Sequence, residues 1–214
     1  MVSNSSDPTS FSVFDQDLDE HHAQHFALSS TIAVDTEAMG LIHGRDRLCL
    51  VQICDEKDNV ACVKIVLGQK SAPKLKELLE NPSIEKVFHF ARFDVAALAS
   101  CLGIAVNPIF CTKIASKIGR TYSPRHGLKE VISELVGVEL DKQAQSSDWG
   151  QVDQLSTKQL AYAANDVRYL LEAKKKLESM LKRERRLELA QKCFRCVPVM
   201  AELDRLRFTQ IFEH

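Results

Sequence analysis

Four carboxylates in three separated segments are the side chains of this sequence best suited to chemistry. They are Asp35, Glu37, Asp94 and Asp166, with Tyr162 four residues before the last of them. Carboxylates that gather in one place repel one another, and proteins usually neutralise such a group with divalent cations, which prefer oxygen ligands. If folding brings the four together, the sequence predicts a site for two divalent cations.

The first two acids directly follow a short apolar run, residues 32–34, which we interpret as a buried strand. Side chains at positions i and i+2 of a strand point to the same face of a sheet. Asp35 and Glu37 can therefore share one cation.

The other two acids are predicted to lie on helices. Ser156 and Gln159 have the spacing of a capping box at the start of a helical pattern over residues 156–180. Tyr162 and Asp166 then lie one turn apart on the same face. Asp94 is expected to open a second helix that runs through residues 95–102, after a strand at 86–90.

Each segment also has an ordinary interpretation when it is taken alone. An Asp-x-Glu pair at a strand end is usually solvated, and Asp94 could be only the N-cap of the helix it opens. A Tyr-x-x-x-Asp pair on a helix is usually a core tyrosine beside a capped or exposed acid. The order and context of all three segments together favour the metal site.

The remaining pattern predicts a mixed α/β sheet. Expected strands cover residues 31–36, 48–54, 60–66, 86–90 and a short stretch near Ile109. Further helices are expected at residues 71–80, 112–118, 128–136 and about 183–206. Three early hairpin strands followed by alternating strands and helices are typical of this class. We find no internal repeat and no Walker-type loop.

Length and composition predict a compact intracellular protein. The chain has 214 residues, of which 45% are hydrophobic and 27% charged, an ordinary balance for one globular domain. We expect an acidic N-terminal segment over residues 1–28, ordered at most in part, and a single domain over 29–214. No signal peptide or membrane span is visible, so we expect a cytoplasmic location.

Cysteines and histidines offer two weaker metal candidates. The 7 cysteines show no disulfide-scaffold spacing, which favours reduced core thiols. Cys193 and Cys196 lack a second ligand pair nearby, so we do not expect zinc. His21, His22 and His25 are expected to lie in an unordered tail rather than in a metal site.

The charge is unevenly distributed. Residues 1–44 contain seven acids and no Lys or Arg, so the rest of the chain carries 28 basic and 22 acidic side chains, a net +6. This excess is small for a protein that grips long duplex DNA, whose many phosphates need many cations. It suits a short, phosphate-poor substrate.

The three acidic segments, in this order, resemble the DEDDy 3′-5′ exonucleases, the group of ribonuclease D and the proofreading exonuclease domains. The segment 46–53 is similar to the second strand of ribonuclease D relatives. Segments 110–117, 125–130 and 145–149 resemble the short NrnC-type oligoribonucleases. The resemblance runs from about Ile32 to the C-terminus and implies a ribonuclease H-like, DnaQ-like fold with additional C-terminal helices.

The resemblance also implies roles for the site. Asp35, Glu37, Asp94 and Asp166 would be metal ligands for two divalent cations, Mg²⁺ or Mn²⁺. Tyr162 would orient the attacking water, because a phenol with a pKa near ~10 is a poor base at neutral pH.

Four further residues are predicted to contact substrate. Leu41 lies where short-substrate relatives place an apolar wedge between two bases, although a buried turn leucine is the alternative. Arg125 and His126, in the basic loop 120–126, could hold a terminal phosphate, although a solvated connector is the alternative. His89 is the fourth residue predicted to contact substrate. Trp149 is expected either to stack on a base or to pack in the core.

Three functions compete. The first is a metal-dependent 3′-5′ exoribonuclease that hydrolyses short RNA, dinucleotides such as pGpG in particular, to 5′-mononucleotides. The second is a trimming exonuclease on structured RNA or DNA ends, and the third is a non-catalytic nucleic-acid-binding protein. All four acids and Tyr162 are present, which disfavours the third. The resemblance implies a homo-oligomer, in the form of a ring-shaped octamer. The lack of a long apolar run predicts no membrane partner.

Overall fold

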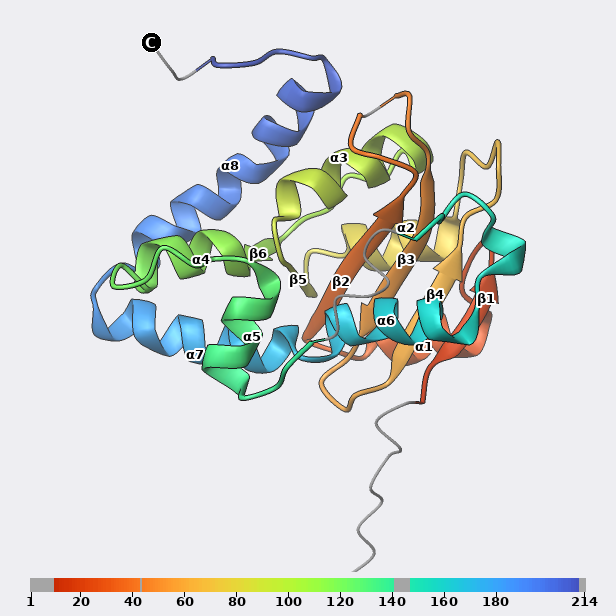
Figure 1. Ribbon diagram of the computed structural model, residues 1–214. Helices are drawn as coiled ribbons and strands as arrows, with labels where there is room; N and C mark the ends of the chain where they lie inside the picture. The colour runs from red at the N-terminus through yellow and green to blue at the C-terminus, as the bar shows by residue number, and fades with distance from the viewer. Residues whose placement is uncertain (1–9, 43, 141–146, 212–214) are drawn as a thin grey trace, which may run out of the picture.

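A six-stranded mixed sheet forms the centre of the computed structural model, which describes residues 10–42, 44–140 and 147–211. Across the sheet the strands are ordered β1-β4-β3-β2-β5-β6 (Figure 1). Their bounds are β1 Ser12–Asp15, β2 Thr31–Ala38, β3 Leu48–Cys54, β4 Val60–Lys64, β5 Glu85–Phe88 and β6 Ile109–Cys111. Every residue of β3 is buried, as expected for a central strand covered on both faces.

The strand pairing confirms the predicted mixed sheet. β2, β3 and β4 form an antiparallel meander, which corresponds to the three predicted hairpin strands. β5 pairs in parallel with both β2 and β6, and β1 pairs in parallel with β4. The strand predicted at 86–90 ends earlier, at Phe88, because the chain turns there into the next helix.

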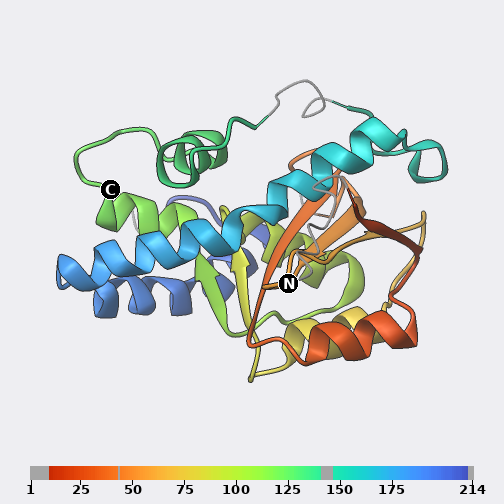
Figure 2. The ribbon, with the colours of Figure 1, turned by 90° about the horizontal axis from the view of Figure 1, so that it is seen from below.

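Helices cover both faces of this sheet. Their bounds are α1 Glu20–Ala27, α2 Pro73–Glu80, α3 Ala91–Leu102, α4 Thr112–Gly119, α5 Leu128–Val136, α6 Thr157–Arg168, α7 Leu170–Arg183 and α8 Leu187–Arg205, with a short 3₁₀ helix η1 at Val152–Gln154. Figure 2 shows α6 and α7 on one side of the sheet and α1 and α2 on the other.

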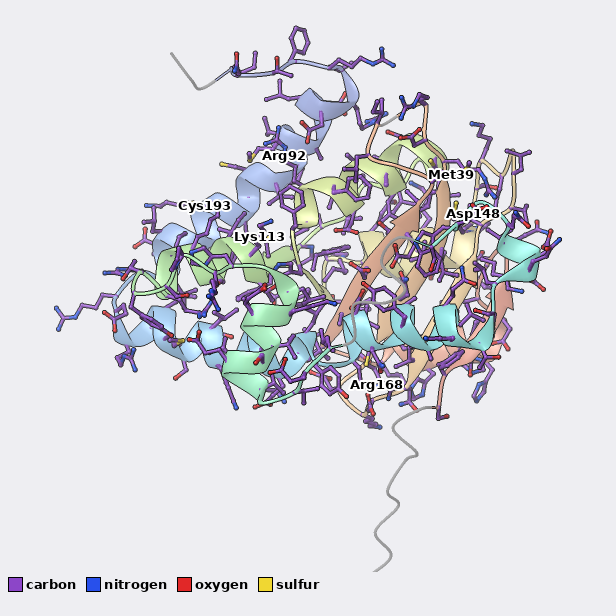
Figure 3. All side chains as sticks on the ribbon, in the orientation of Figure 1. Met39, Arg92, Lys113, Asp148, Arg168 and Cys193 are labelled. Carbon is purple, nitrogen blue, oxygen red and sulfur yellow. The ribbon has the colours of Figure 1, made fainter. Side chains whose placement is uncertain are left out.

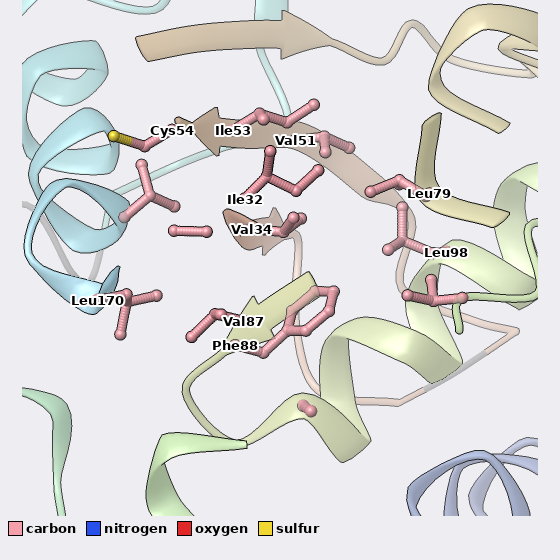
Figure 4. Packing of buried hydrophobic residues seen from close by; sticks show 14 of the residues in the cluster. Ile32, Val34, Val51, Ile53, Cys54, Leu79, Val87, Phe88, Leu98 and Leu170 are labelled. Carbon is pink, nitrogen blue, oxygen red and sulfur yellow. The ribbon is translucent and has the colours of Figure 1, made fainter. Parts of the chain in front are cut away.

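The core is divided by the alternation of the strands. Ile32 and Val34 of β2 lie on the face that carries Leu79 of α2 and Leu98 of α3 (Figure 4). Cys54 of β3 points the opposite way, toward α6. Asp35, which follows Val34 in the strand, therefore faces the α6 side.

The single helix predicted over residues 156–180 is divided at Tyr169. Tyr169 caps α6 and precedes α7 with φ −99° and ψ −2°. α6 packs on β2, β3 and β4, whereas α7 packs mainly on α4 and α5 and extends beyond the sheet (Figure 1). A periodic sequence pattern cannot locate such a change of packing partner, which is why the prediction missed the break.

The expectation of an unordered tail around the N-terminal histidines is wrong. Residues 12–15 form β1 and residues 20–27 form α1, and β1 is the edge strand of the main sheet, paired with β4. Asp19 caps α1 by accepting a hydrogen bond from the His22 backbone N–H at 2.8 Å. The Phe26 side chain of this helix is buried in the core. The boundary between residues 28 and 29 remains a prediction.

None of the helices in the described ranges is both long enough and apolar enough to span a membrane.

Candidate active site

The first two acids lie where β2 continues past the end of its neighbour. β5 pairs with β2 at Thr31–Ala33, so Asp35 and Glu37 lie beyond this parallel pairing, on the part of β2 that leads into the loop. A register shift follows between Glu37 and Ala38. Such irregularities re-aim side chains and end strand pairing. This end of β2 is therefore open to side chains from the helices.

Asp166 reaches the same place from α6. The predicted capping box is present, since Ser156 accepts from the Gln159 backbone N–H and the Gln159 side chain accepts from the Ser156 backbone N–H. The apolar face of α6 packs against the sheet. As a result, carboxylate oxygens of Asp35, Glu37 and Asp166 all lie within 4.8 Å of one another.

Asp94 approaches from the opposite face of the sheet. It lies in the first turn of α3, which begins at Ala91 after Phe90, a residue in the left-handed conformation with φ 66°. Asp94 is therefore not the N-cap that it could have been from its position in the sequence. Its Oδ1 accepts a hydrogen bond from the Thr36 hydroxyl at 2.7 Å. Thr36 lies between the two β2 acids and points to the α3 side, so it ties Asp94 to their strand.

Burial raises the pKa of all four carboxyl groups, and repulsion from neighbouring acids adds to the rise at Asp35 and Glu37. Burial and the neighbouring acids hold the pKa of Asp35 well above its usual range and raise the pKa of Glu37 to about 8. Burial raises the pKa of Asp94 to about 7 and that of Asp166 to about 6, although hydrogen bonds from Thr36 and Tyr162 oppose these shifts. This cluster of acids therefore favours any cation that reaches it.

Tyr162 is oriented from two sides. Burial and the adjacent Asp166 raise the pKa of the Tyr162 phenol, whose hydroxyl is hydrogen-bonded to Asp166. Its ring lies 6.4 Å from that of Trp149, which is only 3% exposed and packs in the core. Tyr162 is thus a neutral hydroxyl at neutral pH, suited to orient a ligand by hydrogen bonding rather than to remove a proton.

The loop that carries Trp149 is anchored to the sheet. Arg47 donates hydrogen bonds to the carbonyl oxygens of Ile65, at 2.8 Å, and Gly150. Met39 and Asp148 lie side by side at the end of β2 (Figure 3), where both approach Gly150. The wall of the site beside Tyr162 is therefore fixed by Arg47, the residue directly before β3.

Leu41 lies in the connection between β2 and β3, four residues after Glu37, and is not the buried turn leucine of the alternative. Its side chain is 80% exposed. Together with Ile42, Phe90 and Phe93 it lines part of a groove between the β2–β3 connection and the start of α3. Phe90 is 47% exposed, and the Lys113 ammonium lies 4.3 Å from the centre of its ring. The groove offers apolar surfaces on which bases could stack.

His89 faces inward. Its Nδ1 lies 2.9 Å from the Thr112 hydroxyl, which itself donates to the Phe88 carbonyl. Its Nε2 is buried and accepts no hydrogen bond from the described residues. Burial and the nearby Lys113 lower the pKa of His89 to about 3, so the ring is neutral.

The two residues predicted to hold a terminal phosphate have different surroundings. Arg125 is exposed and lines a pocket together with Lys129 and Ser133. The same pocket is also lined by glutamates: Glu130, Glu134 and Glu139. His126 is half-buried, and its Nδ1 lies 2.9 Å from the Ser116 hydroxyl. Arg120, at 0% exposure, holds the loop by donating to the Arg125 carbonyl at 2.7 Å. Arg125 is the more accessible of the pair.

Three residues near the acids were not found from the sequence. Thr36 positions Asp94, Lys129 lowers the pKa of Asp166, and Gln52 is buried directly across from Asp35 in the sheet. Thr36 could have been found, because it lies between the two acids in the strand. Lys129 and Gln52 depend on helix packing and strand register, which the spacing of residues does not give.

Comparison with known proteins adds to this geometry. Residues 11–182 match the model of a family described as 3′-5′ exonuclease. The ribonuclease D of Sphingobium indicum is 33% identical over 73% of this chain, and the DNA polymerase I of Aquifex aeolicus is 39% identical over 72%. The chain spans only 40% of the first protein and 24% of the second.

Solved structures match over nearly the whole chain. Brucella melitensis NrnC bound to pGG is 45% identical, with a TM-score of 0.89 over 96% of this chain and 100% of the other. A second NrnC structure contains Mg²⁺ and is 44% identical, with a TM-score of 0.89 over 96% of this chain and 99% of the other. Escherichia coli RNase D is 26% identical, with a TM-score of 0.78 over 92% of this chain but 51% of its own.

The raised pKa values predict that the metal-free protein loses stability as the pH rises. Between pH 6.5 and 8 the unfolded chain has ionised its carboxyls, whereas the folded state still binds protons at Glu37 and Asp94, so folding weakens with pH. In EDTA we expect the melting temperature to fall across this window. The melting temperature of Glu37→Gln should fall less across this window and should be higher than that of wild type at pH 8.

The control for this measurement is Glu77→Gln, which removes an exposed carboxyl on α2. It should follow the wild-type curve. Saturating Mn²⁺ should remove the pH dependence of the wild type. A wild-type melting temperature that is flat or rises between pH 6.5 and 8 in EDTA would contradict the assignment of repelling carboxylates.

Proposed function

Because this chain belongs to the 3′-5′ exonuclease family, we propose that it is a metal-dependent 3′-5′ exoribonuclease that hydrolyses short RNA, dinucleotides such as pGpG in particular, to 5′-mononucleotides. The observation that carries this proposal is the carboxylate cluster at the end of β2. The near full-length match to NrnC, a structure of which contains pGG, supports the short substrate.

Asp35, Glu37 and Asp166 would hold divalent cations, Mg²⁺ or Mn²⁺, with Asp94 supporting them. Four carboxylate side chains are the oxygen donor set that these ions prefer, and the raised pKa values indicate charge that a cation would relieve. When bound, the cations would activate water and stabilise the charge that develops on the phosphate. The Thr36 hydroxyl keeps Asp94 oriented toward this site.

Tyr162 would orient the attacking water. Its hydroxyl is fixed by Asp166 and its ring by Trp149, and its raised pKa keeps the phenol protonated. Positioning of this kind lowers the barrier by holding reacting groups in line rather than by transferring a proton. His89, Arg125 and His126 remain proposed substrate contacts, with Arg125 the accessible one.

The runner-up function is trimming of structured RNA or DNA ends, as the ribonuclease D and DNA polymerase I matches would allow.

We also propose that the chain assembles into a homo-oligomer, as a ring-shaped octamer. Exposed apolar side chains on α8 and after it are available for such contacts: Leu189, Val199, Leu206, Phe208 and Ile211. A cytoplasmic location remains a prediction.

Product length against time tests the function. With Mn²⁺ and 5′-labelled RNAs from dinucleotide to heptamer, we expect rapid cleavage of the dinucleotide and little cleavage of longer chains. Asp166→Asn should abolish hydrolysis by removing a ligand, and Tyr162→Phe should reduce it severely while substrate binding survives. Asp153→Asn, an exposed acid in η1, is the matched control and should keep full activity.

Two outcomes would count against the proposal. A ladder of steadily shortening products from the heptamer would instead indicate the trimming exonuclease. Turnover close to wild type in Asp166→Asn would remove the basis for the site.

Leu41→Ala tests the apolar wedge. If Leu41 separates two stacked bases, its loss should weaken dinucleotide binding by about 1–3 kcal/mol, the usual contribution of stacking one base. Leu67→Ala, at an 82% exposed leucine after β4, is the matched control. Titration of a non-hydrolysed dinucleotide by calorimetry gives both affinities. Unchanged affinity in Leu41→Ala means that Leu41 is not a wedge.

Arg125→Glu tests the terminal phosphate. Reversing this exposed charge should weaken binding of a 5′-phosphorylated dinucleotide more than binding of the same dinucleotide without the phosphate. Lys70→Glu, at an exposed cation between β4 and α2, is the control and should affect neither. Competition binding with the two dinucleotides provides the comparison, and equal weakening of both would refute a phosphate-specific role.

A further inference from the structure

Gln52 is a buried amide whose hydrogen-bonding groups are unused. It lies in β3, a strand whose other residues are apolar or cysteine, and its side chain is 0% exposed. Within the described part of the chain neither its Nε2 nor its Oε1 has a hydrogen-bond partner. Burying an amide without partners is unfavourable, so such a group in a central strand calls for an explanation.

The strand register places this amide beside the carboxylate cluster. Gln52 is paired directly with Asp35 across the antiparallel β2–β3 ladder. Directly opposite residues project to the same face with Cβ atoms about 4.5–5.5 Å apart. A side chain with two methylenes before its amide can span that distance to a neighbouring carboxylate.

The other neighbours of Gln52 offer little competition. On its far side it is paired with Cys62 of β4, whose thiol is a weak hydrogen-bonding group. The buried residues of α6, apart from Asp166, are apolar: Leu160, Ala163, Ala164 and Val167. The Arg168 side chain is also only 4% exposed, but it carries donors alone and forms an ion pair with Asp58. The strong acceptors within reach of the Gln52 amide are therefore those of the acidic site.

We infer that Gln52 is a positioning residue for Asp35: in the cation-bound protein its Nε2–H group, which has no partner here, would donate to the Asp35 carboxylate and hold it in the orientation that binds divalent cations. This inference rests on the proposed metal site. Ligands in metal sites are commonly held by outer hydrogen bonds of this kind. An amide suits the role because it donates a hydrogen bond to an ionised carboxylate without adding a charge that would compete with the cation.

The alternative is a leftover buried polar group without a role. The two interpretations predict different effects when the amide is replaced by an apolar side chain of similar length. If the amide has no role, its replacement should leave both stability and metal affinity intact, because no hydrogen bond is broken and an unpaired polar group is removed. If the amide positions Asp35, its replacement should lower the metal affinity while the fold stays intact.

The test is Mn²⁺ titration by calorimetry of the full chain, stripped with EDTA, for wild type and Gln52→Met. We expect the Mn²⁺ dissociation constant of Gln52→Met to rise about 10–100-fold, the usual effect of removing such a hydrogen bond. Its metal-free melting temperature should equal or exceed that of wild type. Raising Mn²⁺ should restore hydrolysis, which a damaged fold would not allow.

Cys62→Ala is the matched control, because it alters the packing on the other side of Gln52 under α6. It should lower the metal-free melting temperature and leave the Mn²⁺ dissociation constant unchanged. If Gln52→Met does not fold, Gln52→Asn keeps the amide but shortens its reach, and it should also lose Mn²⁺ affinity.

The outcomes separate this inference from the function on which it rests. Wild-type Mn²⁺ affinity in a folded Gln52→Met or Gln52→Asn protein overturns the positioning role. A wild-type protein that binds no Mn²⁺ overturns the metal site itself. Equal loss of affinity in Cys62→Ala would show that general packing, rather than the amide, is responsible.

Discussion

The mutual repulsion of the carboxylates at the end of β2 is the interaction on which the rest of this structure depends. Oxygens of Asp35, Glu37 and Asp166 lie within 4.8 Å of one another, with Asp94 close enough to raise the pKa of Asp35. Without a counter-charge this arrangement opposes folding above neutral pH. The surrounding structure must therefore hold the acids together and leave them accessible to cations.

The topology of the sheet meets both requirements. β2 is held in the sheet by β3 along its length and by β5 at its start, so its backbone is fixed where the acids begin. Beyond that pairing, α6 brings Asp166 from one face and α3 brings Asp94 from the other. The capping box defines the start of α6, which carries Asp166, and the hydrogen bond from Thr36 holds Asp94 in place. The cluster thus forms where elements from both layers meet.

The sequence was sufficient for the parts of this arrangement that depend on local spacing. The i, i+2 pair on a strand and the i, i+4 pair on a capped helix are properties of short segments, and both are present in the structure. The break at Tyr169 and the ordered residues 12–27 were missed because they depend on which surface each segment packs against. Gln52 was missed for a related reason, since its importance comes from the strand opposite it.

The same constraint bears on how a short substrate could be bound. Proteins that bind long nucleic acids gain affinity from many phosphate contacts, each of which releases counterions. A dinucleotide offers few phosphates, and the net charge of +6 over residues 45–214 is correspondingly small. Affinity must then come largely from stacking on the bases. Leu41 and Phe90, exposed apolar side chains that line one groove, are surfaces on which bases of the proposed substrate could stack.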